Sequence, residues 1–203
     1  MNTLLDISLI IDRLSRLVGK SIIWLILVAT LISAINAIVR KAFNVGSNAF
    51  LEIQWYLFAA VFLLGAGYTF LQNNHVRIDV ISSRLSPRTR IWIDIGGIIF
   101  FVIPLCWFMV SFAWPIVAQA YNSGEMSSNA GGLIRWPVYA LVPLGFVLLG
   151  LQSISELIKR VAYLTGHGPD PLRSGGGHGG QDDHDASAAD AAHSDASNEA
   201  RQP

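Results

Sequence analysis

Long apolar runs, separated by short polar segments, dominate the first four fifths of the chain. Four of these runs are free of charge over at least eighteen residues. A nineteen-residue helix rises about 1.5 Å per residue and spans roughly 28 Å, which matches the hydrocarbon thickness of a bilayer. The pattern therefore predicts an all-α integral membrane protein. Its four transmembrane helices are expected at about residues 21–39, 50–72, 91–118 and 135–158.

The segment before the first span, residues 1–20, is itself amphipathic. Apolar side chains recur there at helical spacing, at Leu4, Ile7, Ile11, Leu14 and Val18. This spacing predicts a helix that either lies in the membrane interface and leads into the first span, or extends the first span as one long helix. The acidic residues of this segment, Asp6 and Asp12, argue against a cleaved signal peptide.

The last segment, residues 164–203, has a different composition. It is rich in Gly, Ala, Asp and His, and from residue 166 onward it contains seven acidic residues against two arginines. Such a sequence buries too little apolar surface to offset chain entropy, so we expect a disordered acidic tail. The zero net charge of the whole chain thus conceals a basic membrane body and an acidic tail.

The distribution of Lys and Arg predicts the orientation. With four spans, both termini and the loop between spans two and three lie on one side, and that side carries ten basic residues against three on the other. The positive-inside rule then places both termini in the cytoplasm. Basic residues that flank apolar spans indicate topology and lipid contact and do not indicate nucleic acid. The candidate contacts with lipid headgroups are Arg13, Arg16, Arg88 and Arg90.

The composition also limits the chemistry. Only 14% of the residues are charged, about half the usual share of a soluble domain. The single cysteine, Cys106, excludes a disulfide framework and a cysteine zinc site. No histidine lies in a predicted span, which disfavours haem, and no catalytic set of residues is present. We therefore expect neither an enzyme nor a bound cofactor or metal.

Glu52 is the main acidic residue at the external side, in the first turn expected for the second span. A structural interpretation gives it a role with the helix dipole, next to Ser47 and Asn48 as possible caps. A functional interpretation pairs it with Arg135, Arg40 or a basic residue of a partner. No carboxylate lies at mid-membrane depth, which disfavours a stand-alone ion-coupled carrier.

Two local features of the spans are also informative. Ser86 and Pro87 have the pattern of an N-cap and first residue of the helix that becomes span three. Small residues such as Gly65, Gly67 and Gly145 allow helices to approach closely. These small residues serve either packing among the four helices of this chain or packing against another membrane protein.

The loop after the second span carries a family resemblance. Residues 65–68 read Gly-Ala-Gly-Tyr, residues 74–79 read Asn-His-Val-Arg-Ile-Asp, and residues 83–88 read Ser-Arg-Leu-Ser-Pro-Arg. With the four-span layout, this resembles the small membrane subunit of tripartite ATP-independent periplasmic (TRAP) transporters. The resemblance covers about residues 10–163, and the acidic tail departs from it.

The resemblance implies an accessory scaffold subunit in the bacterial cytoplasmic membrane. In such systems a periplasmic binding protein captures an organic acid, and a large multi-span subunit carries it inward with a sodium gradient. The small subunit packs on the large one, helps to dock the binding protein and binds no substrate. The candidate contacts with a partner subunit, or within the loop itself, are Glu52, His75, Arg77, Asp79, Arg84 and Arg135.

Two other function classes remain as alternatives. A stand-alone small ion-coupled carrier, acting as a homodimer, predicts transport by this chain alone and its loss when Glu52 is neutralised. A membrane enzyme or redox anchor predicts a bound cofactor. For the polar loop, Arg77 and Asp79 either pair with each other or contact the large subunit or lipid phosphates.

Overall fold

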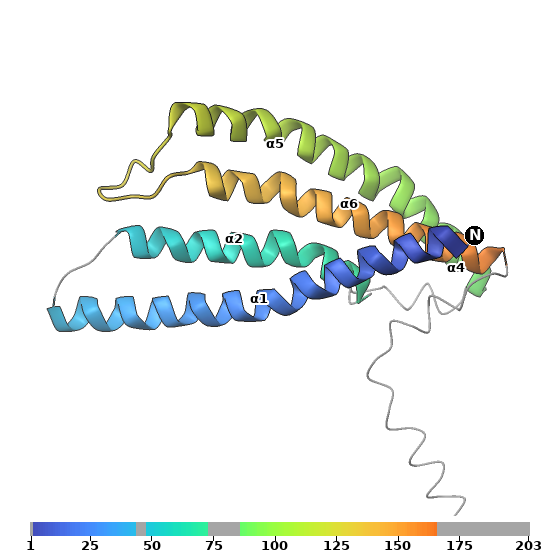
Figure 1. Cartoon of the computed structure of the whole chain (residues 1–203), viewed down its shortest axis with the longest axis horizontal. Helices are drawn as coiled ribbons and strands as arrows, with labels where there is room; N and C mark the ends of the chain where they lie inside the picture. Colours follow the sequence, from blue (N-terminus) through green and yellow to red (C-terminus); the bar gives the residue numbers. More distant parts are fainter. Residues whose placement is uncertain (1, 44–47, 73–85, 166–203) are drawn as a thin grey trace, which may run out of the picture. The chain divides into compact units, whose positions relative to one another are not determined.

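A computed structural model describes residues 2–43, 48–72 and 86–165 of the chain. These residues form four helical rods (Figure 1). Each rod is long and apolar enough to cross a membrane, so the prediction of four long apolar helices is confirmed. The rods are α1 (Asn2–Phe43), α2 (Asn48–Leu71), α4 (Pro87–Gly97) with its continuation, and α6 (Trp136–Leu164).

The third rod consists of α4, a π-helical turn (Ile98–Val102) and α5 (Ile103–Ser123). It begins as the sequence predicts, because the Ser86 side chain accepts a hydrogen bond from the Thr89 amide at 3.3 Å and Pro87 follows. The π-helical turn ends two residues before Pro104, whose ring prevents regular hydrogen bonding with the preceding turn. Gly124 ends the rod in a left-handed conformation with φ 61°.

The first rod is longer than a single span requires. Helix α1 continues without a break for 42 residues, roughly 60 Å at 1.5 Å per residue and about twice the hydrocarbon thickness. Of the two arrangements open for residues 1–20, the structure therefore has the one long helix. A separate helix for residues 2–20 is not formed, since α1 continues unbroken through Gly19 and Lys20.

Neighbouring rods pack in the order α1, α2, α6 and α5 across the bundle, and the start of α1 also packs on the last turns of α6 (Figure 1). Glycines make the closest approach possible. A Cβ on Gly145 of α6 would lie 2.7 Å from the Leu63 carbonyl oxygen of α2, and a Cβ on Gly67 would lie 3.3 Å from the Leu148 oxygen. These small residues serve packing within the chain.

The bundle has two ends, which we name by their content. The "termini end" holds the start of α1, helix α4 and the end of α6 (Figure 1). The "loop end" holds the segment between α5 and α6, residues 124–135.

Between the ends, large apolar side chains point outward and few are buried, as in a helix bundle surrounded by lipid or by another membrane protein. Exposed examples include Phe62, Phe100, Trp107, Phe112 and Trp114.

Candidate functional site

At the loop end, the carboxylate of Glu52 binds the segment between α5 and α6. Its Oε2 accepts a hydrogen bond from the Leu133 backbone amide at 2.7 Å, and its Oε1 accepts one from the Asn129 side-chain nitrogen Nδ2 at 2.8 Å. The Ser127 hydroxyl donates a further hydrogen bond to Oε1. The Glu52 side chain is buried by these contacts. One carboxylate thus satisfies three donors of a single loop.

Two further residues of α2 hold the same loop. Asn48 donates its side-chain amide to the Ala130 carbonyl at 3.2 Å, and the Tyr56 hydroxyl donates to the Ile134 carbonyl at 3.1 Å. Asn48, Glu52 and Tyr56 are spaced by four residues and share one face of the helix. That face is the platform on which the loop lies.

The loop also has internal structure. Met126 and Ile134 form an isolated antiparallel bridge, the Ser127 amide donates to the Leu133 carbonyl at 2.9 Å, and Gly131 turns the chain with φ 72°. Arg135 pairs with Glu125 through Nη1 and Oε1 at 2.9 Å. The hydrogen bond to Glu125 raises the pKa of Arg135, so this guanidinium stays charged at any physiological pH.

The structure corrects the position that the sequence predicted for Glu52, in the first turn of the helix. Glu52 lies one residue beyond the first turn of α2, which contains no acidic residue, and its carboxylate points to the loop. Arg135 pairs with Glu125, which lies nearer to it along the loop. Ser47, the other proposed cap, lies outside the described residues.

A second polar cluster lies at the termini end, between α1, α4 and α6. Lys159 Nζ pairs with Asp12 Oδ2 at 3.0 Å and with Glu156. Arg160 pairs with the same Glu156 and, through Nε, with Asp94 Oδ2 at 3.3 Å. Asp12, Glu156 and Arg160 are buried. The cluster thus ties the start of α1 and helix α4 to the last turns of α6.

Uncharged partners complete this cluster. Gln152 donates to Asp12 Oδ1 at 2.9 Å and accepts from Ser15 at 2.6 Å. The Ser155 hydroxyl lies 2.8 Å from Asp12 Oδ1 and 2.7 Å from the Ser8 hydroxyl. The sequence alone did not predict that these polar residues meet at one site. The available signal was the polar stripe Ser8, Asp12 and Ser15 on one face of an otherwise apolar helix.

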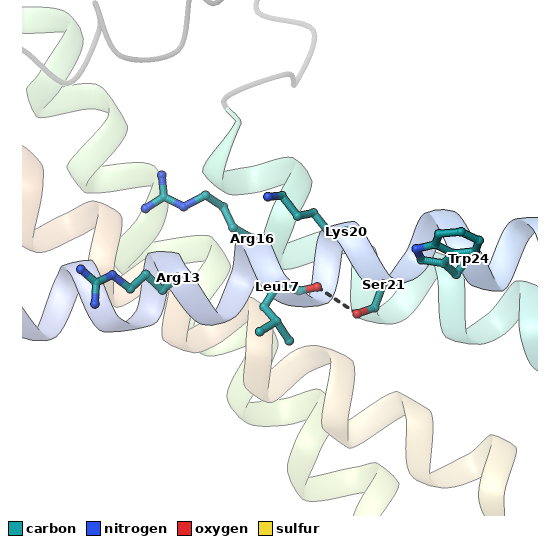
Figure 2. Close-up of a pocket in the computed structure, with 6 residues that line it drawn as sticks. All are labelled: Arg13, Arg16, Leu17, Lys20, Ser21 and Trp24. Atoms are coloured by element: carbon teal, nitrogen blue, oxygen red, sulfur yellow. Dashed lines mark hydrogen bonds between the residues drawn. The ribbon is translucent and has the colours of Figure 1, made fainter.

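The basic residues of α1 form a third feature, a groove on the outer face of the helix (Figure 2). Arg13, Arg16 and Lys20 extend from it, and Leu17, Ser21 and Trp24 complete its lining. The three cations are exposed, and in the described part of the chain none pairs with a carboxylate. The predicted contacts Arg13 and Arg16 are thus brought together with a third cation.

The other predicted contact residues are placed only in part. Arg88 and Arg90 both lie in the first turn of α4. The Arg88 side chain is exposed and the Arg90 side chain is half-buried. His75, Arg77, Asp79 and Arg84 lie outside the described residues, as does the acidic tail. Within residues 2–43, 48–72 and 86–165, no group of three His, Cys, Asp or Glu side chains is arranged to hold a metal ion.

Comparison with known proteins now decides the family. The family described as "Tripartite ATP-independent periplasmic transporters, DctQ component" matches residues 29–162. The chain belongs to this DctQ family. The match includes the loop held by Glu52 and the last turns of α6, but it begins after Asp12. The chain is thus a TRAP transporter small permease, a multi-pass protein of the inner membrane, and its family is a transporter component and not an enzyme family.

A curated relative agrees with the DctQ assignment. The chain is 26% identical, over 166 residues, to the ectoine TRAP transporter small permease protein TeaB of Halomonas elongata. The alignment covers 77% of this chain and 84% of the relative. No solved structure matches the chain. DctQ membership implies association with a large permease and a periplasmic binding protein.

Proposed function

We propose that this chain is the accessory scaffold subunit of a transporter that imports organic acids delivered by a periplasmic binding protein. In this proposal it packs on the large transport subunit, helps to dock the binding protein and binds no substrate itself. The observation that carries the proposal is the loop at residues 124–135, which the Glu52 carboxylate holds in one conformation.

A docking surface benefits from such a loop. A loop that is already ordered loses little conformational entropy when a partner binds, so more of the contact energy appears as affinity. Met126 and Ile134 are exposed apolar residues on it, and Ser128, Asn129 and Ala130 are exposed at its turn. This mixture of apolar and polar groups suits a transient protein contact.

The proposed orientation of the chain in the membrane comes from the distribution of Lys and Arg. The positive-inside tally puts the loop end in the periplasm and both termini in the cytoplasm. In that orientation the loop faces the compartment of the binding protein. The basic groove of Arg13, Arg16 and Lys20 then lies at the cytoplasmic leaflet, where we propose that it contacts anionic headgroups together with Arg88 and Arg90.

The middle of the bundle supports a static role. The stretches 21–39, 53–71, 95–123 and 136–155 contain no charged residue. The ion pairs at the termini end bind helices to one another. An ion-coupled carrier normally places ionisable groups at mid-membrane depth. We therefore assign the substrate and coupling-ion sites to the large subunit. The outward apolar and aromatic faces supply surface for packing against that subunit and lipid.

The substrate class is part of the proposal. The name of the Halomonas relative specifies ectoine for that protein. Because substrate recognition in this arrangement lies in the other two components, this chain does not distinguish one organic acid from another.

Co-purification and docking test the proposal. The full chain is expressed with its large subunit and binding protein, and a stoichiometric complex is expected in mild detergent. Ser128→Trp adds a bulky ring to the exposed loop without removing a bond to Glu52, so it should weaken binding of the purified binding protein at least tenfold. Leu17→Trp, an exposed change at the termini end, is the matched control. A chain that purifies alone, or equal binding in both variants, would contradict the scaffold or the docking role respectively.

A further inference from the structure

An apolar groove lies between α1 and α2, beside the basic groove of α1. Its lining comprises Gly19, Ile22 and Ile23 from α1 and Val61, Phe62, Gly65, Ala66, Tyr68 and Thr69 from α2. It has a volume of about 420 Å³. Apart from Tyr68 and Thr69, the residues that line it have no polar side-chain atom. The groove therefore suits an apolar chain.

The packing of α1 on α2 fixes the register of this groove. A Cβ on Gly19 would overlap the Tyr68 ring, so this ring lies directly on α1. One turn further along α1, a Cβ on Gly65 would lie 3.4 Å from the Ile22 Cδ1 atom. The contact positions rise along α1 while they fall along α2, so the two helices run antiparallel through the groove.

The groove leads into the membrane interior. On α2 it extends from Thr69 to Val61, about 12 Å at 1.5 Å per residue. Except for Gly19, its lining residues all belong to the stretches 21–39 and 53–71, which contain no charged residue. Such stretches are the parts of a chain that lie in hydrocarbon. An acyl chain in this groove would therefore lie beside α2 at the depth of the lipid tails.

The basic groove adjoins the apolar groove on α1. Lys20 follows Gly19 directly and lies one turn, about 4.5 Å along the axis, from Ile23. Arg16 lies about two turns before Ile23 and on the same face of the helix. Side chains three or four residues apart are neighbours on a helix surface. The row Arg16, Lys20 and Ile23 therefore connects the two grooves, and we call the two cations the mouth of the apolar groove.

The mouth has positive charge that nearby carboxylates do not neutralise. Figure 2 shows Arg16 and Lys20 extending to the same side of α1, with Trp24 further along the helix. None of the six residues that line the basic groove is acidic. Asp12, the nearest acidic residue along the chain, is directed to α6, where it pairs with Lys159. The mouth thus presents cations beside a tryptophan, a residue typical of the headgroup level.

We propose that one anionic phospholipid binds at these two adjoining grooves. Its phosphate contacts Arg16 and Lys20, and one acyl chain lies in the apolar groove against Ile23 and Phe62. A phospholipid joins an anion to hydrocarbon in this same order, which a soluble anion does not. The inference deepens the headgroup contact proposed above, because it adds a site for the lipid tail. Its place in the cytoplasmic leaflet rests on the proposed orientation, whereas binding itself does not.

Photolabelling tests the site directly. The full chain is reconstituted in phosphatidylcholine vesicles that contain a trace of phosphatidylglycerol with a diazirine on one acyl chain, and labelled residues are mapped by mass spectrometry. Adducts are expected on the apolar groove, including Ile23 and Phe62. A phosphatidylcholine probe with the same acyl chains but no net charge should label these residues at least tenfold less.

The headgroup site is tested by removing its two charges. Arg16→Gln with Lys20→Gln should reduce labelling by the phosphatidylglycerol probe about 30-fold, the combined effect of two basic residues near a membrane surface. Arg40→Gln with Lys41→Gln is the matched control, because it removes the same charge from the last turn of the same helix. Labelling of the apolar groove should be unchanged in this control.

The tail site is tested with an exposed ring. Phe62 is 78% exposed and lines the apolar groove, so Phe62→Ala should lower labelling of Ile23 several-fold and leave the fold intact. Thermal unfolding in detergent verifies the fold. Phe100→Ala is the matched control, because the Phe100 ring is 77% exposed and lies in the third rod, away from this groove.

Three results would overturn the proposal. Equal labelling by the two probes, or full labelling after both charges of the mouth are removed, would indicate ordinary annular lipid. Complete competition by millimolar glycerol 3-phosphate, with no effect of Phe62→Ala, would assign the mouth to a soluble anion. Loss of the adducts in the complex with the large subunit, with Lys20 cross-linked to that subunit instead, would assign the surface to a protein contact. Co-purification with the large subunit is a separate measurement, so failure of the lipid site and failure of the scaffold role are distinguishable.

Discussion

The carboxylate of Glu52 and the backbone amide of Leu133 lie 2.7 Å apart although they are 81 positions apart in the chain. This hydrogen bond joins α2 to the loop that precedes α6. It acts together with the bonds that Asn129 and Ser127 make to the other carboxylate oxygen. The loop is thus held to α2 by three hydrogen bonds to one carboxylate, together with the bonds that Asn48 and Tyr56 donate to its backbone.

Glu52→Gln should loosen this loop. The carboxylate accepts at both oxygens, whereas an amide presents one oxygen and one NH2 group. Whichever way the amide is turned, its NH2 group faces either the Leu133 amide or the Asn129 donor. We expect residues 124–135 to become several-fold more sensitive to limited proteolysis, with little change in overall helix content by circular dichroism.

A control variant and a binding measurement complement the proteolysis of Glu52→Gln. Glu125→Gln removes a carboxylate from the same loop, but one whose partners, Arg135 and the Tyr139 hydroxyl, lie at the edge of the loop and in α6, so its effect should be smaller. Binding of the periplasmic protein should weaken in Glu52→Gln in step with the proteolysis rate. Unchanged proteolysis and unchanged binding together would show that the loop does not depend on this carboxylate.

Asp12→Ala should destabilise the termini end by about 2 kcal/mol. This lies between the small effect of an exposed ion pair and the 3–5 kcal/mol lost on breaking a fully buried one, because Asp12 is buried but Lys159 is partly exposed. Thermal unfolding in detergent measures the change. Gln152 and Ser155 would also lose their acceptor.

A double-mutant cycle separates the ion pair from these other losses. Asp12→Ala with Lys159→Ala should be less destabilising than the sum of the two single changes, because each single change leaves one charge without its partner. The remaining pair of Lys159, with Glu156, limits the coupling. Strict additivity would mean that Asp12 and Lys159 do not interact in the folded chain.

The features that sequence could predict are the local ones. Long uncharged apolar runs define helices because backbone groups in a membrane must be satisfied within the helix. The cap formed by Ser86, Pro87 and the Thr89 amide lies within four consecutive residues, so the local sequence alone reveals it. The sequence does not decide the length of α1, since an amphipathic repeat before a span fits both a separate interfacial helix and a longer first span.

The polar sites depend on which helices meet, and a single sequence does not state this. Asp12 acquires its partners only because the start of α1 lies on the end of α6. Arg135 was considered as the partner of Glu52, but the loop geometry places Glu125 against it instead. For Asp12 the available signal was the helical spacing of Ser8, Asp12 and Ser15 within α1.

Gly145→Ala tests the crossing of α2 and α6. The added Cβ would lie 2.7 Å from the Leu63 carbonyl oxygen, a backbone atom that moves only with its helix. We expect a loss of about 1–3 kcal/mol in stability, the usual effect of overpacking a close contact. Gly97→Ala is the control, because its Cβ would meet nothing within 4 Å. That variant should be unchanged or more stable by up to about 1 kcal/mol, through helix propensity.

Membrane orientation can be measured with the single native cysteine as the starting point. Cys106 is buried within α5, and Cys106→Ser gives a cysteine-free background for full-length reporters. Ser128→Cys on the exposed loop should react in intact cells with a maleimide that does not cross the inner membrane. Ser174→Cys in the acidic tail should react only after the membrane is opened, because ten of thirteen basic residues flanking the spans lie on the tail's side. The reverse pattern of labelling would place the loop in the cytoplasm and remove the loop from reach of a periplasmic partner.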